Sequence, residues 1–173
     1  AYSESGQLAQ AADQFHQAVA LNERIGRAVG LAINLGNLGL LQLRTGQFGP
    51  ALDHLTRAVD LDPDGVRHSN IPSLINGMAQ ANRYLGHLQP ALDQHTRALA
   101  ICQELGDVND EAEILSDLAV LYGQLGQFES ALRYADAAVA LSDTSSYVAV
   151  AKAVAHTARS TIRSWLGDHQ LAV

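Results

Sequence analysis

Residues 35–58 read LGNLGLLQLRTGQFGPALDHLTRA, and this stretch decides the fold. Two apolar segments with helical spacing flank Gly46, which is followed closely by an aromatic residue, Phe48. Glycine adopts the left-handed backbone conformation without steric cost, so Gly46 is expected to end one helix. Pro50 then falls in the first turn of the next helix, where a missing N–H group is harmless. The stretch therefore predicts a helix–turn–helix unit.

The same pattern recurs along the chain at a constant spacing of 40 residues, which is the signature of a repeat protein. Each turn has a glycine, a polar residue and a large apolar residue, and two alanines seven apart follow it. The turns are Gly6-Gln7-Leu8, Gly46-Gln47-Phe48, Gly86-His87-Leu88 and Gly126-Gln127-Phe128. The alanine pairs are Ala11 and Ala18, Ala51 and Ala58, Ala91 and Ala98, and Ala131 and Ala138.

This register predicts an all-α fold, an α-solenoid of antiparallel helix pairs. We expect first helices at 28–44, 68–84 and 109–124. Second helices are expected at 7–24, 48–62, 88–104 and 128–142. The paired alanines lie on one face of each second helix, where a small side chain lets neighbouring backbones approach closely.

These residues resemble the tetratricopeptide repeat. Its consensus is matched, in order, by Leu38-Gly39, Gly46, Ala51, Ala58 and Pro63. A period of 40 exceeds the usual 34 and leaves HEAT-type repeats as an alternative on length alone. The Gly-Gln-Phe turn and the alanine spacing favour the tetratricopeptide repeat. The segments 104–107 and 111–115 also resemble long repeats of actinobacterial transcriptional regulators and related signalling ATPases.

We expect the repeat array to cover residues 1–143. It divides into a half repeat at 1–26, where Tyr2 falls late in a first helix, and repeats at 27–66, 67–106 and 107–143. Residues 144–173 are expected to form a C-terminal capping helix or the start of a further repeat, because Arg159 and Arg163 replace apolar repeat positions. Its apolar stripe comprises Tyr147, Ala151, Val154, Ala158, Ile162 and Trp165.

Composition argues against several classes of function. The chain has 173 residues, is 47% hydrophobic but 5% aromatic, and carries a net charge of −7. Phosphate binding needs clustered basic residues, so direct binding of nucleic acid is not expected. No apolar run reaches the length of a membrane span, and one cysteine forms no internal disulfide. These features predict a cytoplasmic location, and we interpret the chain as a fragment of a longer protein.

No residue pattern predicts catalysis, a metal or a cofactor. The seven histidines show no paired i, i+4 spacing and no cysteine cluster. His95 takes the core-facing position that Phe15 and Leu55 hold in sister repeats, so we expect it to be a partly buried packing residue. The acidic residues near 107–113 suit the positive end of a helix dipole, and Cys102 has no cation beside it in the sequence that would lower its pKa.

The resemblance implies a peptide-binding groove lined by the first helices. Carried over by register, the candidate groove residues are Asn37, Arg44, Asn76, Gln80, Arg83, Tyr84, Asp117 and Gln124. Amide side chains can both donate and accept hydrogen bonds, which suits an extended peptide backbone.

We therefore expect a protein–protein interaction module that belongs to a larger bacterial regulatory or signalling protein, with a role in signal transduction or transcription regulation. The alternative is a structural scaffold that stacks on further repeats or self-associates through its truncated repeat ends. An enzyme or small-molecule sensor is a third hypothesis, and it would need a closed pocket.

Overall fold

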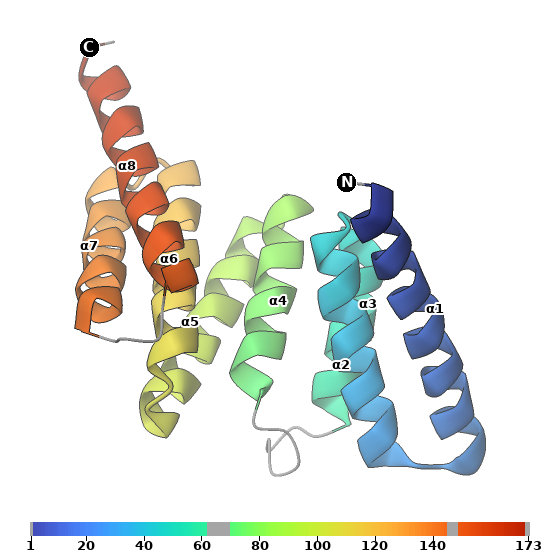
Figure 1. The fold of residues 1–173 in the computed structure, drawn as a ribbon. Helices are drawn as coiled ribbons and strands as arrows, with labels where there is room; N and C mark the ends of the chain where they lie inside the picture. The colour runs from blue at the N-terminus through green and yellow to red at the C-terminus, as the bar shows by residue number, and fades with distance from the viewer. Residues whose placement is uncertain (1, 62–69, 145–148, 172–173) are drawn as a thin grey trace. The chain divides into compact units, whose positions relative to one another are not determined.

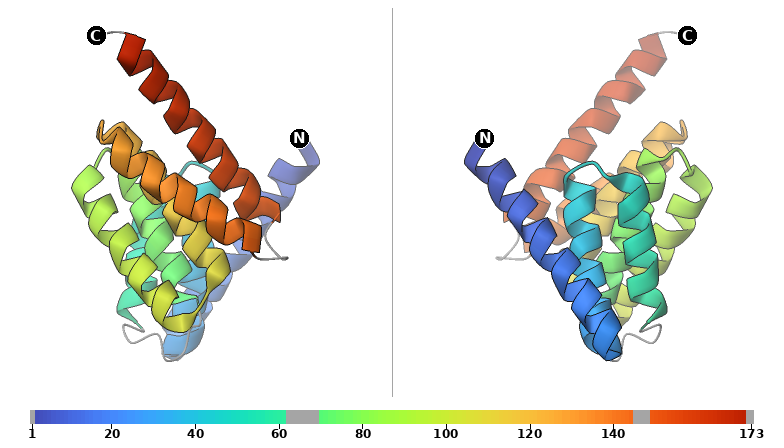
Figure 2. Two further views of the ribbon diagram at one scale, coloured as in Figure 1. Left: turned by 90° about the vertical axis from the view of Figure 1, so that its left-hand side faces the viewer. Right: turned by 90° about the vertical axis from the view of Figure 1, so that its right-hand side faces the viewer.

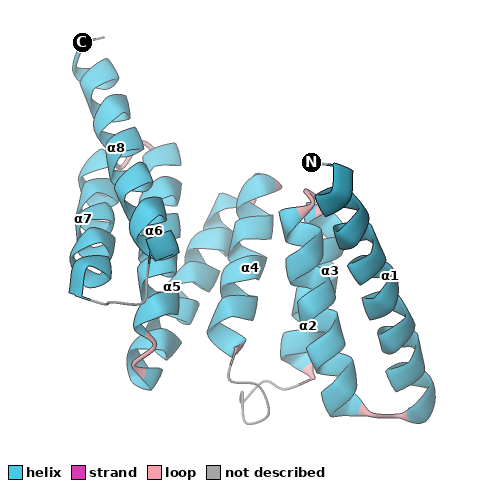
Figure 3. Ribbon diagram, viewed as in Figure 1, coloured by secondary structure: helices cyan, strands magenta, loops and turns pink. Residues whose placement is uncertain are grey.

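The computed structural model describes residues 2–61, 70–144 and 149–171, and all regular structure within these ranges is helical (Figure 3). The helices are α1 (Tyr2–Ile25), α2 (Ala28–Arg44), α3 (Phe48–Asp60), α4 (Ile71–Tyr84), α5 (Leu88–Leu105), α6 (Val108–Gln124), α7 (Phe128–Thr144) and α8 (Ala149–Leu171). The predicted all-α solenoid of helix pairs is confirmed.

The chain divides into two compact units, Ala1–Gln94 and His95–Val173, and the boundary falls inside α5 (Figure 1). In the first unit α1 packs on α2, α2 on α3, and α3 on α4. In the second unit α6, α7 and α8 pack on one another. Each unit therefore has its own helix–helix core.

Three of the predicted glycine turns are present. Gly46, Gly86 and Gly126 have φ values of 78°, 83° and 73°, which L-residues with a side chain rarely adopt. Gly26 and Gly106, both with φ 70°, close the turns that lead from a second helix to the next first helix. These two turns were not among those expected from the sequence pattern.

Gly6 does not form the turn that the register predicts. Helix α1 begins at Tyr2 and continues through Gly6, so the expected break before residue 7 is wrong. A glycine inside a helix costs only about 1 kcal/mol relative to alanine, so the helix can continue through Gly6.

Small residues bring the helices of the first unit together. Ala51 and Ala58 of α3 are 0% and 1% exposed, as their spacing predicts. On α2, a Cβ added to Gly39 would lie 2.6 Å from Cγ of Leu55 and 3.2 Å from the backbone oxygen of Ala51. Helix α2 therefore meets α3 at Gly39 more closely than a methyl group would allow.

Helix α8 covers α6 and α7 in the second unit. Ile162 is fully buried with Ala119, Ala131 and Ala135, and Trp165 packs against the same cluster. A Cβ on Gly123 of α6 would clash with the Trp165 ring, so the indole lies directly on that glycine. Helix α8 continues through Gly167 without a turn.

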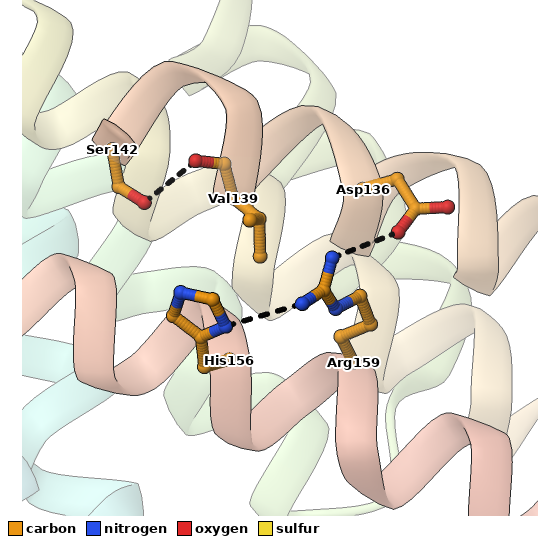
Figure 4. Close-up of polar contacts among 5 residues, drawn as sticks. All are labelled: Asp136, Val139, Ser142, His156 and Arg159. Carbon is orange, nitrogen blue, oxygen red and sulfur yellow. Dashed lines mark hydrogen bonds and ion pairs between the residues drawn. The ribbon is translucent and has the colours of Figure 1, made fainter. Parts of the chain in front are cut away.

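Arg159 lies beside α7 and forms polar contacts there (Figure 4). One guanidinium nitrogen is 3.6 Å from Oδ1 of Asp136, and the other terminal nitrogen is 3.2 Å from Nδ1 of His156. An arginine is therefore accommodated where the repeat pattern has an apolar residue. Of the predicted stripe, Tyr147 lies outside the described residues, as do the side chains of Ala151 and Val154.

Candidate functional site on the first helices

The first helices α2 and α4 contact each other in the first unit. A Cβ on Gly36 would lie 3.0 Å from the side chain of Leu74, and a Cβ on Gly77 would lie 3.0 Å from that of Leu40. At each glycine, a leucine side chain of the opposite helix packs against the backbone. The contacts at these two glycines are apolar, so they offer no polar group to a peptide.

The predicted groove residues differ in exposure. In the first unit Arg44 and Tyr84 are exposed, and Asn37, Gln80 and Arg83 are half-buried. In the second unit, on α6, Gln124 is exposed and Asp117 is half-buried. The side chains of these residues remain accessible to a partner.

Asn76 is different, because it is only 4% exposed and has an interaction of its own within the fold. Its amide is not open to a ligand in this structure. The expectation that Asn76 contacts a peptide is therefore not supported by its burial, and the structure favours a packing role.

Arg83 and Tyr84 form a stacked group with Phe48 near the end of α4. The Phe48 and Tyr84 rings are 4.3 Å apart with an interplanar angle of 9°. The guanidinium carbon of Arg83 lies 4.4 Å from the Tyr84 ring centroid, within the range of a cation–π contact. Tyr84 is 56% exposed although Phe48 and Arg83 both lie against its ring, so an aromatic residue and a cation are presented together.

The Nε atom of Arg83 is buried and has no hydrogen-bond acceptor among the described residues. Because Nε is buried, an external acceptor would have to bind the terminal N–H groups of the guanidinium. A carboxylate or a peptide carbonyl is the kind of group that such a donor set binds.

The structure also shows polar or aromatic pairs that join a first helix to its second helix. His54 Nδ1 lies 2.7 Å from Gln42 Oε1, and Asn82 donates to Gln94 Oε1 at 2.9 Å. Forty residues further on, the rings of Tyr122 and Tyr134 stack at 5.1 Å. The pairs recur in the 40-residue register, so the alignment of repeats could have identified them.

The surroundings of two of these residues shift their acid–base behaviour. Burial lowers the pKa of His54, and the nearby His16 and Arg57 lower it further. Burial raises the pKa of Tyr122, with a smaller contribution from Tyr134. Both groups are thereby kept neutral at physiological pH.

The described residues form neither a metal centre nor a reactive thiol. Nowhere in these ranges do three His, Cys, Asp or Glu side chains gather as metal ligands. His95 is fully buried, more deeply than the partly buried packing position expected from its register. Burial, followed by Asp110, Asp107 and Glu111, raises the pKa of the Cys102 thiol to about 12, which keeps it protonated and poorly nucleophilic.

The first unit also holds a mainly apolar cavity of about 210 Å³ between α1 and α2. In the 40-residue register, Ala12 takes the position of Leu52 and Leu132, and Thr45 takes the position of Trp165. The cavity therefore arises where small residues replace large ones. It is lined by Leu8, Ala9, Ala12, Leu41, Gln42, Thr45 and Gln47.

Helix pairs with glycine turns and alanine seams define the chain as an α-helical repeat protein. The tetratricopeptide repeat model matches residues 1–64 and 70–144, so the chain belongs to the tetratricopeptide repeat family. Tetratricopeptide repeats are in general protein–protein interaction modules, and the competing HEAT-type interpretation is not supported.

Solved structures agree on the fold. A putative kinesin light chain from Podospora anserina with nearly identical TPR-like repeats has a TM-score of 0.77 at 19% identity, covering 99% of this chain and 84% of its own. BtubC from P. vanneervenii has a TM-score of 0.80 at 16% identity, covering 97% and 70%. MamA has a TM-score of 0.63 at 16% identity, covering 97% and 94%.

No curated protein matches the sequence. Within the described residues, no helix has the length and apolar character needed to cross a membrane.

Proposed function

We propose that the chain is a protein–protein interaction module whose first helices bind a peptide segment of a partner. The observation that carries this proposal is the accessible group of Arg83 and Tyr84 stacked on Phe48. Asn37 and Gln80 add accessible amides to the first helices of the same unit. A partner segment with an acidic or carbonyl-rich stretch would satisfy the Arg83 donors.

The register extends this proposal to the second unit, where α6 carries Asp117 and Gln124. The wider role that fits is part of a larger bacterial regulatory or signalling protein, located in the cytoplasm. Its long repeats would then correspond to those of actinobacterial regulators and signalling ATPases.

Selection of binders from a random peptide library tests the proposal. We expect selected peptides to lose about tenfold or more in affinity with Arg83→Ala, since a charge-assisted hydrogen bond contributes about 1.5–3 kcal/mol. Arg133→Ala is the matched control, because Arg133 is an exposed arginine on the second helix α7. Both variants should keep the helical content of the parent.

Two results would contradict the groove. Loss of peptide binding with Arg133→Ala but not with Arg83→Ala would move the site to the second helices. A concentration-dependent increase in molecular mass, with no selectable peptide, would instead support the alternative of a self-associating structural scaffold.

A further inference from the structure

The cavity between α1 and α2 has a buried amide group in its wall. These two helices lie side by side and pack on each other (Figure 2, right). Among the residues that line the cavity, Leu41 and Gln42 are only 8% and 5% exposed and form its buried end. Ala9, Thr45 and Gln47 are exposed and form its mouth. The cavity is therefore closed on one side and accessible from solvent on the other.

Two small side chains account for the space. In the second unit, the register positions of Ala12 and Thr45 hold Leu132 and Trp165, which pack against one core cluster. A leucine side chain and an indole ring thus occupy there the volume that the first unit leaves between its helices. The cavity results from the size of the side chains at these two positions.

The volume of about 210 Å³ limits the size of a ligand. An apolar cavity of about 150 Å³ accommodates benzene, whereas pockets for drug-sized molecules have about 300–1,000 Å³. A molecule with a single ring and a few further atoms therefore fits. The indole at the sister position shows that a flat ring suits the space between two such helices.

The amide of Gln42 has a fixed orientation and an unpaired donor. Nδ1 of His54, on α3, lies 2.7 Å from Oε1 of Gln42. Because an amide oxygen only accepts, the Nδ1 of His54 carries the proton and donates it. The Nε2 of Gln42 has no acceptor among the described residues. A nearly buried amide in the cavity wall therefore keeps two N–H donors without a protein partner.

The polar groups at the mouth are already paired with each other. The Thr45 hydroxyl donates to the backbone oxygen of Leu41 at 3.1 Å, and Gln47 Nε2 donates to Thr45 Oγ1 at 3.1 Å. No charged side chain lines the cavity. A ligand is therefore required to supply an acceptor for Gln42, to carry no charge and to be apolar elsewhere.

We propose that this cavity is a binding site for a small, neutral, single-ring aromatic carbonyl compound, whose carbonyl oxygen accepts from Gln42 Nε2. The ring lies against Leu8 and Leu41, which with the alanines make the cavity mainly apolar. This is a small-molecule site in addition to the peptide groove, and it does not depend on that groove.

The mouth favours a free molecule over the side chain of a partner protein. An anchoring side chain at a protein interface is usually surrounded by further contacts that exclude water. The exposed lining residues Ala9, Thr45 and Gln47 include no large apolar side chain that could provide such contacts. A ligand that lies wholly within the cavity needs no apolar surface around it.

Acetophenone is the probe, because it has one ring and one carbonyl acceptor. Titrated into the isotope-labelled full chain, it should shift the amide resonances of residues 8–12 and 41–47 in a saturable manner. Ethylbenzene has the same ring without an acceptor and should bind about fivefold more weakly, as expected for the loss of one hydrogen bond. Both compounds are compared below the solubility limit of ethylbenzene.

Two variants test the two parts of the site. Gln42→Leu removes the donor and should abolish the preference for acetophenone over ethylbenzene. Ala12→Leu fills the cavity and should weaken binding of both compounds by about tenfold or more while the chain stays folded, as judged by circular dichroism. Ala20→Leu is the matched control, because it adds the same side chain at an exposed position of α1. It should bind acetophenone as the parent does, and so should Arg83→Ala.

Four results would overturn the proposal. Absence of saturable shifts would show that the cavity takes no such ligand, and equal binding of both compounds to the parent would exclude the hydrogen bond from Gln42. Unchanged binding in Ala12→Leu would place the ligand elsewhere. A capped tripeptide with tyrosine between two glycines that binds this cavity more tightly than acetophenone would identify a partner side chain as the occupant.

Discussion

At the scale of single residues, Gly39 and Gly49 are both helical glycines, yet they differ in the space around them. A Cβ on Gly39 would lie within 3 Å of two Leu55 atoms, whereas Gly49 has no atom within 4 Å. Gly39→Ala should therefore lower the free energy of unfolding by about 1–3 kcal/mol through overpacking, although the sister repeats carry alanine there.

Gly49→Ala is the control, and it should leave stability unchanged or raise it by up to about 1 kcal/mol through helix propensity. Urea denaturation followed by circular dichroism measures both variants. Equal stability of the two would show that α2 and α3 do not meet as closely as described.

Ala12 lines the cavity between α1 and α2, and leucine is the residue at its sister positions 52 and 132. Ala12→Leu should partly fill the cavity and raise the free energy of unfolding by about 1 kcal/mol. Ala20→Leu adds the same side chain at an exposed position of α1 and should change stability by less than about 0.5 kcal/mol. A destabilised Ala12→Leu would indicate that the cavity cannot accept the larger side chain.

His54 should make the fold less stable in acid. Its pKa is lowered in the folded state from 6.5, first by burial and then by His16 and Arg57. Below pH 6.5 the unfolded chain therefore binds a proton at this histidine that the folded chain does not. The free energy of unfolding thus decreases as the pH decreases, until the pH is below the pKa of the folded state. Above that window this contribution to stability is fully present.

His54→Gln should reduce the loss of stability between about pH 7.5 and pH 5, measured by urea denaturation at each pH. His16→Gln removes one cause of the shift and should reduce the loss by a smaller amount. If His54→Gln leaves the pH dependence unchanged, His54 is not a source of the acid sensitivity.

At the scale of helices, the sequence predicted most boundaries because each depends on a local cause. Gly46, Gly86 and Gly126 end helices through their own backbone conformation, which the 40-residue register makes visible. Gly6 has similar neighbours, yet α1 continues through it. The three residues of the turn pattern therefore do not decide by themselves whether a helix ends.

The exposure of the candidate groove residues was less predictable than the helices. Register assigned Asn37 and Asn76 to the same kind of surface, but only Asn76 is buried. The stacking of Phe48 on Tyr84 joins side chains 36 positions apart, and no periodicity within one repeat reveals it. Side-chain exposure depends on the neighbouring helix, which a pattern on one helix does not contain.

Helix α8 offers a test at this scale, because Trp165 is the only tryptophan of the chain and reports on its packing. Ile162 is 0% exposed, so Ile162→Ala should cost about 2–5 kcal/mol and loosen α8. A shift of the tryptophan emission to longer wavelength should accompany the loss. Arg163→Ala, at an exposed position of the same helix, should leave the emission unchanged.

At the scale of the whole molecule, charge is unevenly distributed. Residues 144–173 contain Lys152, Arg159 and Arg163 against Asp168, a net charge of +2, and the repeat body therefore carries −9. Long-range repulsion disfavours strongly acidic partners for the body as a whole. Acidic groups of a partner are expected to bind only beside local arginines such as Arg83, Arg24 and Arg27.

The division into two units predicts how the molecule unfolds. In a repeat protein each helix pair is stabilised mainly by its neighbours, so a defect acts most strongly on its own unit. Gly39→Ala should accelerate hydrogen exchange of the slowest amides in residues 1–94, and Ile162→Ala should do so in residues 95–173. Native-state exchange read by mass spectrometry of peptic peptides separates the two regions within one sample. If each variant accelerated the slowest amides of both regions equally, the chain would unfold as one cooperative block, and the two units would not be independent in stability.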